Sequence, residues 1–137
     1  MILDTTLLIA AERGRFDMAT FLADQADAPV AIASITASEL LHGVERARDS
    51  AARARRGQYV EGVLGNLPVI PFGMAEARLH ARIWAELATK GKMIGAHDLL
   101  VAATALGAGS TVATLNQRDF KRVGGLGLAP IQRFLRA

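Results

Sequence analysis

Four acidic residues lie where a parallel α/β sheet would bring them together. Asp4 directly follows an apolar segment typical of a buried strand, and Asn116 and Asp119 follow another near the end of the chain. Glu39 and Asp98 lie in the first turns of two predicted helices. Sites in open α/β sheets form beyond the carboxyl ends of the strands, so we expect these side chains at one edge of the sheet.

A cluster of carboxylates favours a hard metal ion held by oxygen ligands. The chain has no cysteine and only three histidines, which disfavours a zinc site. Mg²⁺ and Mn²⁺ suit carboxylate ligands and keep positions open for water and phosphate. Many nucleases use such ions for in-line attack on a phosphodiester, so a nuclease is one chemistry that this pattern indicates.

Each of these residues also has a purely structural interpretation. Asp4 could cap the helix that follows it, and Thr36–Glu39 has the spacing of a capping box. Asp98 could offset a helix dipole, and Asn116 with Asp119 resembles an N-cap pair. Taken singly, the structural interpretation is favoured for each residue. Taken together, it requires several independent coincidences at one edge of the sheet.

The elements that must position these residues alternate between short apolar strands and amphipathic helices. Strands are predicted at residues 1–3, 30–33, 67–71, 111–115 and, more weakly, 128–131. Helices are predicted at residues 7–11, 16–26, after the 36–39 capping box, and at 46–65, 77–88 and 99–106. This alternation predicts an α/β fold with a central, mainly parallel sheet of four to five strands, covered by helices on both faces.

Length and composition fit one intracellular domain. The 137 residues are 51% hydrophobic, enough for a single core over residues 1–137. No apolar run is long enough to span a membrane, and the N-terminus does not resemble a signal peptide. The absence of cysteine suits a cytoplasmic protein. The net charge of +3 favours a polyanion or an acidic protein segment as a partner.

Four stretches of the chain resemble the motifs of PIN-domain nucleases, in the family's order and along nearly the whole chain. These stretches are Ile2–Ile9, Ser38–Leu40 with the following Gly43, His97–Ala105, and Thr114–Phe120. The chain is most similar to the VapC-type toxins within this family. The resemblance implies a three-layer α/β/α fold and a ribonuclease that serves as the toxin of a toxin–antitoxin pair.

The resemblance also implies roles for individual residues. Asp4, Glu39 and Asp98 would hold Mg²⁺ or Mn²⁺, and Thr6 would orient Asp4 or a bound water through its hydroxyl. Many PIN domains have Asp where this chain has Asn116, so a second metal site is in doubt and Asp119 is the residue that would compensate as the fourth catalytic acid. A metal-activated water would then attack the RNA phosphodiester in line.

The resemblance further implies three partners, namely an RNA substrate, an antitoxin that blocks the active site, and a second copy of the chain. The helices from Phe16 and from Ala77 carry apolar residues that favour self-association. Arg46, Arg53 and Arg56 belong to the densest basic stretch, which is either a solvated helix face or a surface for RNA or antitoxin. His97, beside Asp98, is interpreted as a helix-start or substrate-edge residue rather than an acid–base catalyst.

Other functions fit the sequence less well. A phosphoryl-transfer enzyme with an Asp-x-Asp motif would need a second Asp at Thr6, and a receiver domain would need an Asp after a mid-chain strand, where Pro71–Gly73 stands instead. The alternative of another class is a PIN-like fold that binds RNA or protein without catalysis. The acids retained at three motif positions argue against this alternative.

Overall fold

The computed structural model describes residues 1–137 and contains seven α-helices, four short strands and one 3₁₀ helix. The strands are β1 (Ile2–Leu3), β2 (Ile32–Ala33), β3 (Val69–Ile70) and β4 (Val112–Ala113). The helices are α1 (Thr5–Glu12), α2 (Met18–Asp24), α3 (Ser34–Glu45), α4 (Ser50–Asn66), α5 (Met74–Thr89), α6 (Ala96–Gly107) and α7 (Gln117–Phe120), followed by the 3₁₀ helix η1 (Gln132–Phe134). No helix is long and apolar enough to cross a bilayer.

The sheet is parallel, as predicted, but its regular ladders are short. β1 pairs with β4 and β2 pairs with β3, each over two residues. A single parallel bridge between Ile2 and Ala31 joins the two ladders, and another between Val112 and Leu128 replaces the weak last strand predicted near residues 128–131. The spatial order is therefore β3, β2, β1, β4 and then Leu128, with two two-stranded ladders in place of one continuous sheet.

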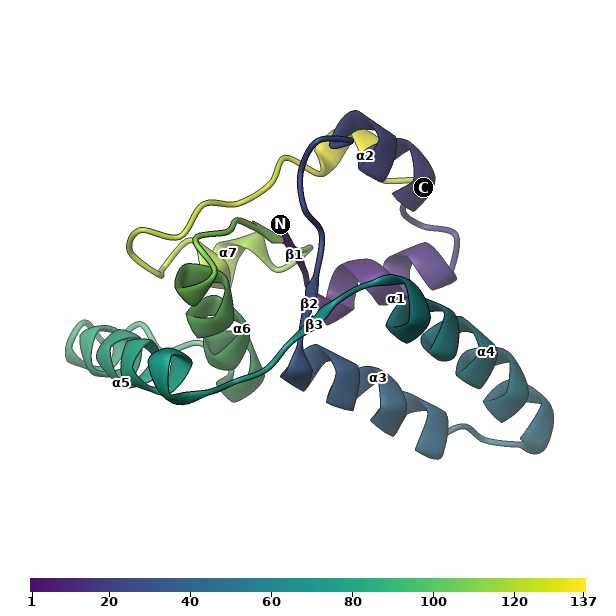
Figure 1. Ribbon diagram of the computed structural model, residues 1–137, viewed down its shortest axis with the longest axis horizontal. Helices are drawn as coiled ribbons and strands as arrows, with labels where there is room; N and C mark the ends of the chain where they lie inside the picture. Colours follow the sequence, from purple (N-terminus) through teal and green to yellow (C-terminus); the bar gives the residue numbers. More distant parts are fainter.

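Two hydrophobic clusters cover opposite faces of the sheet and give three layers. Leu3 and Ala113 belong to the cluster with the side chains of α1, α2 and α4. Ile2 and Val112, their chain neighbours, belong to the cluster with α5, α6 and α7. Successive residues of a strand point to opposite faces, so both faces of β1 and β4 are buried. Figure 1 shows the strands at the centre, with α5 and α6 on one side and α1 and α4 on the other.

The start of every predicted helix differs in the structure, and two of the differences change an interpretation. The capping box at Thr36–Glu39 is wrong, because β2 ends at Ala33 and α3 begins at the next residue. Thr36 is therefore inside the helix and fully buried, and its hydroxyl has no hydrogen-bond partner. The helix predicted at residues 46–65 begins at Ser50, since α3 continues to Glu45 and the Asp49 side chain accepts a 2.8 Å hydrogen bond from Ala52 N.

The aromatic side chains near Phe16 are covered within the chain. The rings of Phe16 and Phe21 lie 5.3 Å apart, and the ring of Phe134 lies 5.2 Å from that of Phe21. All three side chains are at most 5% exposed. The expectation that the helix from Phe16 drives self-association through uncovered apolar surface is therefore wrong for these side chains, because the C-terminal 3₁₀ helix packs on them.

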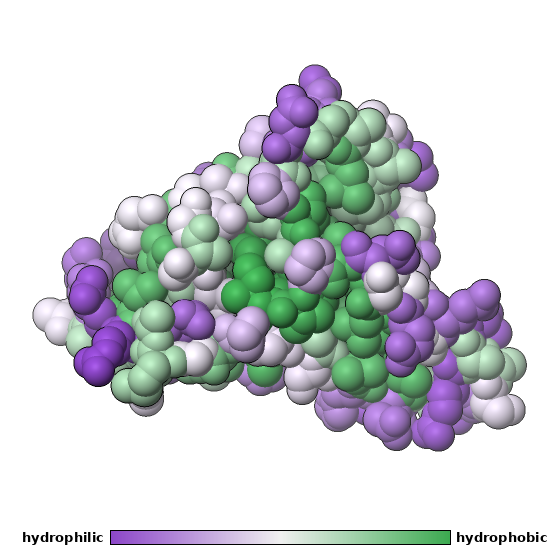
Figure 2. Space-filling model, in the orientation of Figure 1, coloured by the Kyte–Doolittle hydropathy of each residue, from purple (hydrophilic) through white to green (hydrophobic).

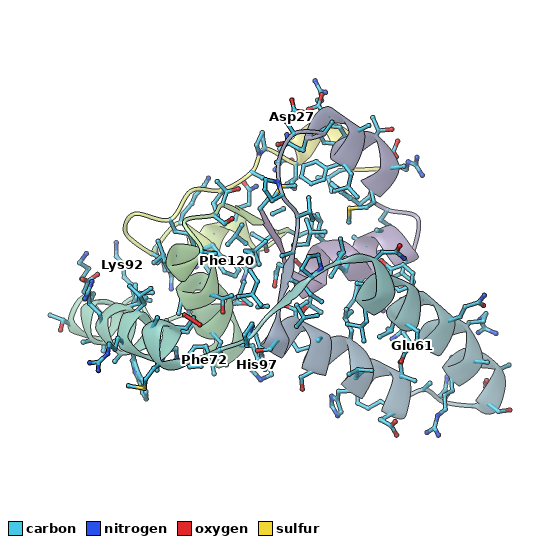
Figure 3. The ribbon with its side chains drawn as sticks, viewed as in Figure 1. Asp27, Glu61, Phe72, Lys92, His97 and Phe120 are labelled. Atoms are coloured by element: carbon cyan, nitrogen blue, oxygen red, sulfur yellow. The ribbon has the colours of Figure 1, made fainter.

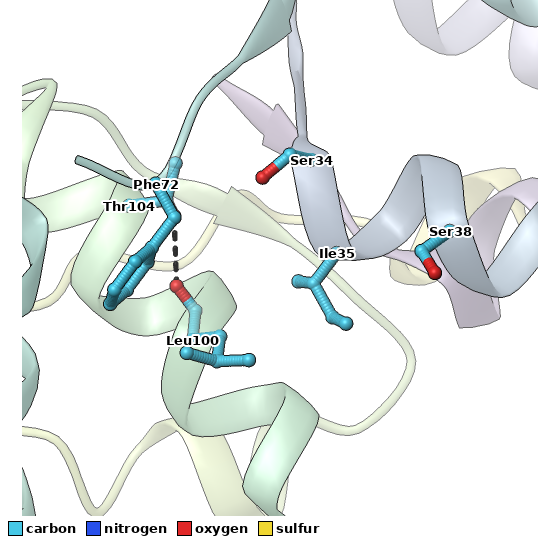
Figure 4. Close-up of a pocket in the computed structure, with 6 residues that line it drawn as sticks. All are labelled: Ser34, Ile35, Ser38, Phe72, Leu100 and Thr104. Carbon is cyan, nitrogen blue, oxygen red and sulfur yellow. Dashed lines mark hydrogen bonds between the residues drawn. The ribbon is translucent and has the colours of Figure 1, made fainter.

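The helix α5, in contrast, carries an apolar surface that nothing in the chain covers. Trp84 is 53% exposed and Met74 is 67% exposed. The ring of His80 lies 5.7 Å from the rings of both Phe72 and Trp84, which joins the three aromatic side chains into one row. Phe72 and Leu100 also lie side by side on one wall of a cavity of about 290 Å³, opposite Ile35 of α3 (Figure 4). We call Phe72, Met74, His80 and Trp84 the aromatic row.

We predict that the aromatic row is the contact between two copies of the chain. Arg78 and Glu86 lie on the exposed surface of α5 on either side of Trp84 along the helix, so two antiparallel copies would bring unlike charges together.

Wild-type protein at micromolar concentration should have the mass of a dimer by light scattering. Trp84→Glu should have the mass of a monomer, because it places an unpaired charge in an apolar contact. Ala54→Glu, on the exposed side of α4, is the control that should remain dimeric. A monomeric wild type would contradict the prediction.

Candidate active site

Asp4 is held at the carboxyl end of β1 by two threonine hydroxyls. Thr6 Oγ1 donates to Asp4 Oδ2 at 2.8 Å, and Thr114 Oγ1 donates to the same oxygen at 2.7 Å. Each hydroxyl in turn accepts a backbone hydrogen bond after β4, Thr6 from Leu115 N at 3.1 Å and Thr114 from Asn116 N at 2.9 Å. Two hydrogen-bonded chains therefore fix one carboxylate that is only 2% exposed.

The interpretation of Asp4 as a helix cap is wrong. Asp4 occupies the N-cap position of α1, but its side chain accepts no hydrogen bond from a backbone N–H of the first turn. Its carboxylate is instead directed to the threonines at the sheet edge. The predicted orienting role of Thr6 agrees with this geometry.

Glu39 is fixed by residues from two other elements. Thr5 Oγ1 donates to Glu39 Oε1 at 2.7 Å, and His97 Nδ1 lies 3.1 Å from Glu39 Oε2. Thr5 begins α1 and His97 lies in the first turn of α6, next to the start of α3 (Figure 3). His97 is 57% exposed while it contacts Glu39, so it lies at the rim of the acidic cluster.

Asn116 joins the two remaining acids. Its amide Nδ2 donates to Asp98 Oδ2 at 2.8 Å and to Asp119 Oδ2 at 3.2 Å. The Asn116 side chain makes no cap hydrogen bond to α7, so the interpretation of Asn116 as a helix cap is wrong. The neutral amide occupies the space between two carboxylates, where it reduces their repulsion without adding a charge.

The pKa of Asp98 shows that the four acids share one electrostatic environment. Burial and then repulsion by Asp4 raise the pKa of Asp98 to about 6, with smaller contributions from Asp119 and Glu39. The hydrogen bond from Asn116 opposes this shift. Burial and the neighbouring carboxylates together disfavour the charged form of Asp98.

The raised pKa of Asp98 predicts how stability depends on pH in the absence of divalent metal. The unfolded-state pKa of Asp is about 3.9, so between about pH 4 and about pH 6 the folded chain binds the extra proton. The free energy of unfolding should therefore fall as the pH rises from about 4 to about 6 and then level off. Asp98→Asn should melt higher than wild type at pH 7.5 in EDTA, and this advantage should shrink at pH 4.5. An advantage that is equal at both pH values would contradict the raised pKa.

The residues at this edge fit Mg²⁺ or Mn²⁺ in their donor chemistry. No three Asp, Glu or His side chains are placed to hold one ion jointly. Mg²⁺, however, commonly binds proteins through one or two carboxylates and completes its shell with water and phosphate oxygens. After burial, repulsion by the neighbouring carboxylates raises the pKa of Asp98, and a bound cation would relieve this repulsion. The carboxylates are therefore suited to an ion that keeps much of its water shell.

The structure separates the predicted arginine contacts into different environments. Arg53 Nη2 donates to Glu45 O at the end of α3, a contact within the fold. Arg56 pairs with Glu12 at 3.1 Å, and Arg46 is exposed. His42, which shares a helix face with Glu39, is also exposed.

Thr5 and Thr114 are the site residues that the sequence analysis missed. Both hold an acidic side chain, Glu39 and Asp4 respectively. A signal was present for Thr114, a polar residue inside an apolar strand segment, since polar groups buried in a sheet need a partner. Thr5 lies next to Asp4, but adjacency along the chain did not indicate that it reaches α3.

Comparison with known proteins finds relatives that are named nucleases. Residues 1–126 match the sequence profile of the PIN domain. The chain is 36% identical over 126 residues to the ribonuclease VapC1 of Rickettsia felis, and the match covers 92% of each protein. It is also 36% identical over 95 residues to the tRNA(fMet)-specific endonuclease VapC of Shigella flexneri, covering 69% of this chain and 70% of the relative.

Solved structures share the fold. VapBC2 from Rickettsia felis, bound to a DNA fragment from their promoter, matches with a TM-score of 0.85 and 28% identity. The match covers 93% of this chain and 96% of the solved chain. The three-layer arrangement of short parallel strands and helices is therefore that of the VapBC structures.

Proposed function

The chain belongs to the PIN-domain family, and on that premise we propose that it is a Mg²⁺- or Mn²⁺-dependent endoribonuclease, the toxin of a toxin–antitoxin pair. The observation that carries the proposal is the convergence of Asp4, Glu39, Asp98 and Asp119 at the edge of the sheet. These residues come from four separate parts of the chain, and their repulsion contributes to a pKa of about 6 for Asp98. A fold without a cation to bind gains nothing from such repulsion.

The carboxylates would hold the ion, and the surrounding residues would keep those carboxylates in place. Asp4 and Asp98 are the proposed ligands, and Glu39 would bind the ion through a water of its shell. Thr6 and Thr114 prevent rotation of the Asp4 carboxylate by donating to the same oxygen. When bound, Mg²⁺ would lower the pKa of an attacking water and stabilise the charge that develops on the phosphate.

The remaining polar residues have supporting roles in this proposal. Thr5 and His97 hold the two oxygens of Glu39, which keeps the carboxylate directed toward the other acids. Asn116 lies between Asp98 and Asp119 and donates a hydrogen bond to each. This contact would hold Asp119 in place while it accepts a hydrogen bond or a proton. Held in this way, the acids need little rearrangement when substrate arrives.

We propose an antitoxin as the protein partner, bound in an apolar groove. The groove has a volume of about 450 Å³, and eight of its eleven lining residues are hydrophobic. It lies between α1, α2 and α4, and its lining includes Leu8, Leu22 and Val63. An amphipathic helix could place its apolar face here, as in other helix-in-groove complexes. One solved structure that shares the fold, VapBC-5 from Mycobacterium tuberculosis, is a member of the VapBC family of toxin–antitoxin systems, which supports this choice.

The position of the groove suggests how the antitoxin inhibits. Leu3 lines the groove and directly precedes Asp4, so a helix bound there would end near the acidic site. An Arg or Lys from the antitoxin could then pair with Asp4, Glu39 or Asp98 and displace the metal ion. Figure 2 shows apolar side chains gathered in the middle of the molecule, with polar ones toward its ends.

The relatives suggest transfer RNA as the first substrate to test. One of them is named a tRNA(fMet)-specific endonuclease. We therefore expect the purified chain to cleave an initiator transfer RNA transcript in Mg²⁺, to stop in EDTA, and to resume when Mg²⁺ is restored. An RNA-binding module without catalysis would bind the transcript and leave it intact under all three conditions. Intact RNA with Mg²⁺ and with Mn²⁺ would contradict the proposed function.

A further inference from the structure

An arginine-lined cavity lies beyond the acidic site, where α3 meets α4. The cavity has a volume of about 650 Å³ and is lined by Arg46, Arg48 and Arg56 together with small residues, namely Gly43, Ala47 and Ala52. We call it the arginine pocket. It contains none of the proposed metal ligands.

The arginine pocket contains guanidinium groups that the fold does not neutralise. Arg46 and Arg48 are exposed and form none of the ion pairs in the structure. Arg56 pairs with Glu12, and a side chain at Gly43 would come within 3.3 Å of Arg56 Nη1. A glycine at that position therefore lets the Arg56 guanidinium lie against α3.

The positive charge of the chain is concentrated at this end of α3 and α4. Residues 46–56 contain five arginines and one aspartate, a net charge of +4. The whole chain has a net charge of +3, so all other residues together have a net charge of −1. The basic character of the protein is thus a property of this one surface rather than of the molecule as a whole.

The arginine pocket and the acidic site lie along the same face of α3. Glu39, Gly43 and Arg46 are spaced at i, i+4 and i+7, which places them on one side of the helix. The rise from Glu39 to Arg46 is about 10 Å, comparable to a few nucleotides of one strand. Helix α1 connects the same two places, since Thr5 bonds to Glu39 and Glu12 pairs with Arg56.

We propose that the arginine pocket binds phosphates of the RNA strand next to the bond that is cleaved. This inference rests on the proposed function, because it assigns a second contact to the same substrate. An RNA strand crossing the acidic site along α3 would reach Arg46 and Arg48, whose guanidinium groups suit phosphate oxygens. The contact would raise affinity for RNA without regard to sequence and would not take part in the chemistry.

The lining favours phosphates over the antitoxin as the occupant. Apart from arginine, the pocket presents only glycine and alanine and offers no large apolar side chain to anchor a protein segment. The apolar groove beside α2 supplies such anchors instead. The two surfaces therefore differ in the chemistry they can recognise.

The test compares two pairs of arginines that lie on different parts of the chain. Arg46→Gln with Arg48→Gln removes two charges from the arginine pocket. Arg15→Gln with Arg82→Gln removes two exposed charges that do not line the arginine pocket and is the matched control. Binding of an oligouridylate and of an initiator transfer RNA transcript is measured over a range of salt concentrations. KM and kcat are measured on the transcript.

The pocket variant should bind both RNAs more weakly. The slope of its log affinity against log salt concentration should become smaller in magnitude by about 1.4, which is about 0.7 for each lost phosphate contact. Its KM should rise about tenfold while kcat stays within about twofold, as expected for lost uniform binding. An unchanged slope and KM, or an equal loss in the control pair, would overturn the inference. A pocket variant that binds RNA as wild type does but binds the antitoxin more weakly would also overturn the inference.

The same experiment separates this inference from the proposed function. If the salt slopes of wild type and the pocket variant differ as expected but wild type cleaves nothing, the proposed function fails and the pocket remains a phosphate site. If wild type cleaves RNA and the pocket variant matches it in KM and slope, only the pocket inference fails. If wild type neither binds nor cleaves RNA, both are overturned.

Discussion

Asp4→Asn should lower the rate of RNA cleavage by about 100- to 1,000-fold while the chain remains folded. The loss follows from removal of one negative charge from the proposed ion site. The fold should persist because both threonine hydroxyls donate to the same oxygen, Oδ2, and an amide oxygen can accept both hydrogen bonds. The change therefore removes charge and keeps the shape of a buried side chain.

Growth of cells that express the chain without its antitoxin gives a sensitive measurement of this loss. Wild type should arrest growth, Asp4→Asn should not, and circular dichroism should show the same helix content for both. Asp27→Asn is the matched control, an Asp-to-Asn change at an exposed residue away from the sheet edge, and it should arrest growth like wild type. Arrest by Asp4→Asn as strong as by wild type would support the binding-module alternative.

Gly62→Arg should free the toxin from its antitoxin, with affinity for the antitoxin reduced at least tenfold, about 1.4 kcal/mol. Gly62 lines the apolar groove, and a Cβ at this position meets no atom within 4 Å. An arginine therefore fits the free chain but occupies the space that a bound helix needs. Arginine also favours the helix more than glycine does, so α4 should not be weakened.

Gly65→Arg is the matched control for this substitution. Gly65 lies on the same helix, also has open space at its Cβ, and does not line the groove. Cells that co-express a cognate antitoxin should grow with wild type and with Gly65→Arg and should stop growing with Gly62→Arg. Rescue of Gly62→Arg as complete as that of wild type would show that the antitoxin binds elsewhere.

The parallel sheet and its covering helices could be predicted from the sequence because apolar strands and amphipathic helices alternate along the chain. Hydrophobic periodicity does not fix where hydrogen-bonded ladders end, so the predicted strand at residues 111–115 became the two-residue β4. Periodicity also does not show that β2 runs directly into α3, which is why the capping box at Thr36–Glu39 was wrong.

The positions of Asp4 and Asp119 could be predicted because each follows a strand, and the carboxyl ends of parallel strands share an edge. The side chains that hold the acidic residues could not all be predicted. Thr114 reaches Asp4 across 110 positions of the chain, and Thr5 reaches Glu39 across 34. Such hydrogen bonds depend on how β1, β4 and α3 pack, and this information is not contained in local spacing.

The arginines show the same limit. The basic stretch was evident in the sequence, but the role of each guanidinium depends on its neighbours in space. Arg53 binds the end of α3, Arg56 pairs with Glu12, and Arg46 stays unpaired in the arginine pocket. Only the fold distinguishes a structural arginine from one that is available to RNA.

The most direct test of the proposed nuclease site is the initial rate at which wild type and Asp98→Asn cleave one RNA after EDTA treatment and return of Mg²⁺. Wild type should regain full activity, and Asp98→Asn should remain at least about 100-fold slower while melting at a higher temperature in EDTA at pH 7.5. Equal rates for the two proteins, or a wild-type rate that does not depend on Mg²⁺, would contradict a metal-dependent nuclease built on these carboxylates.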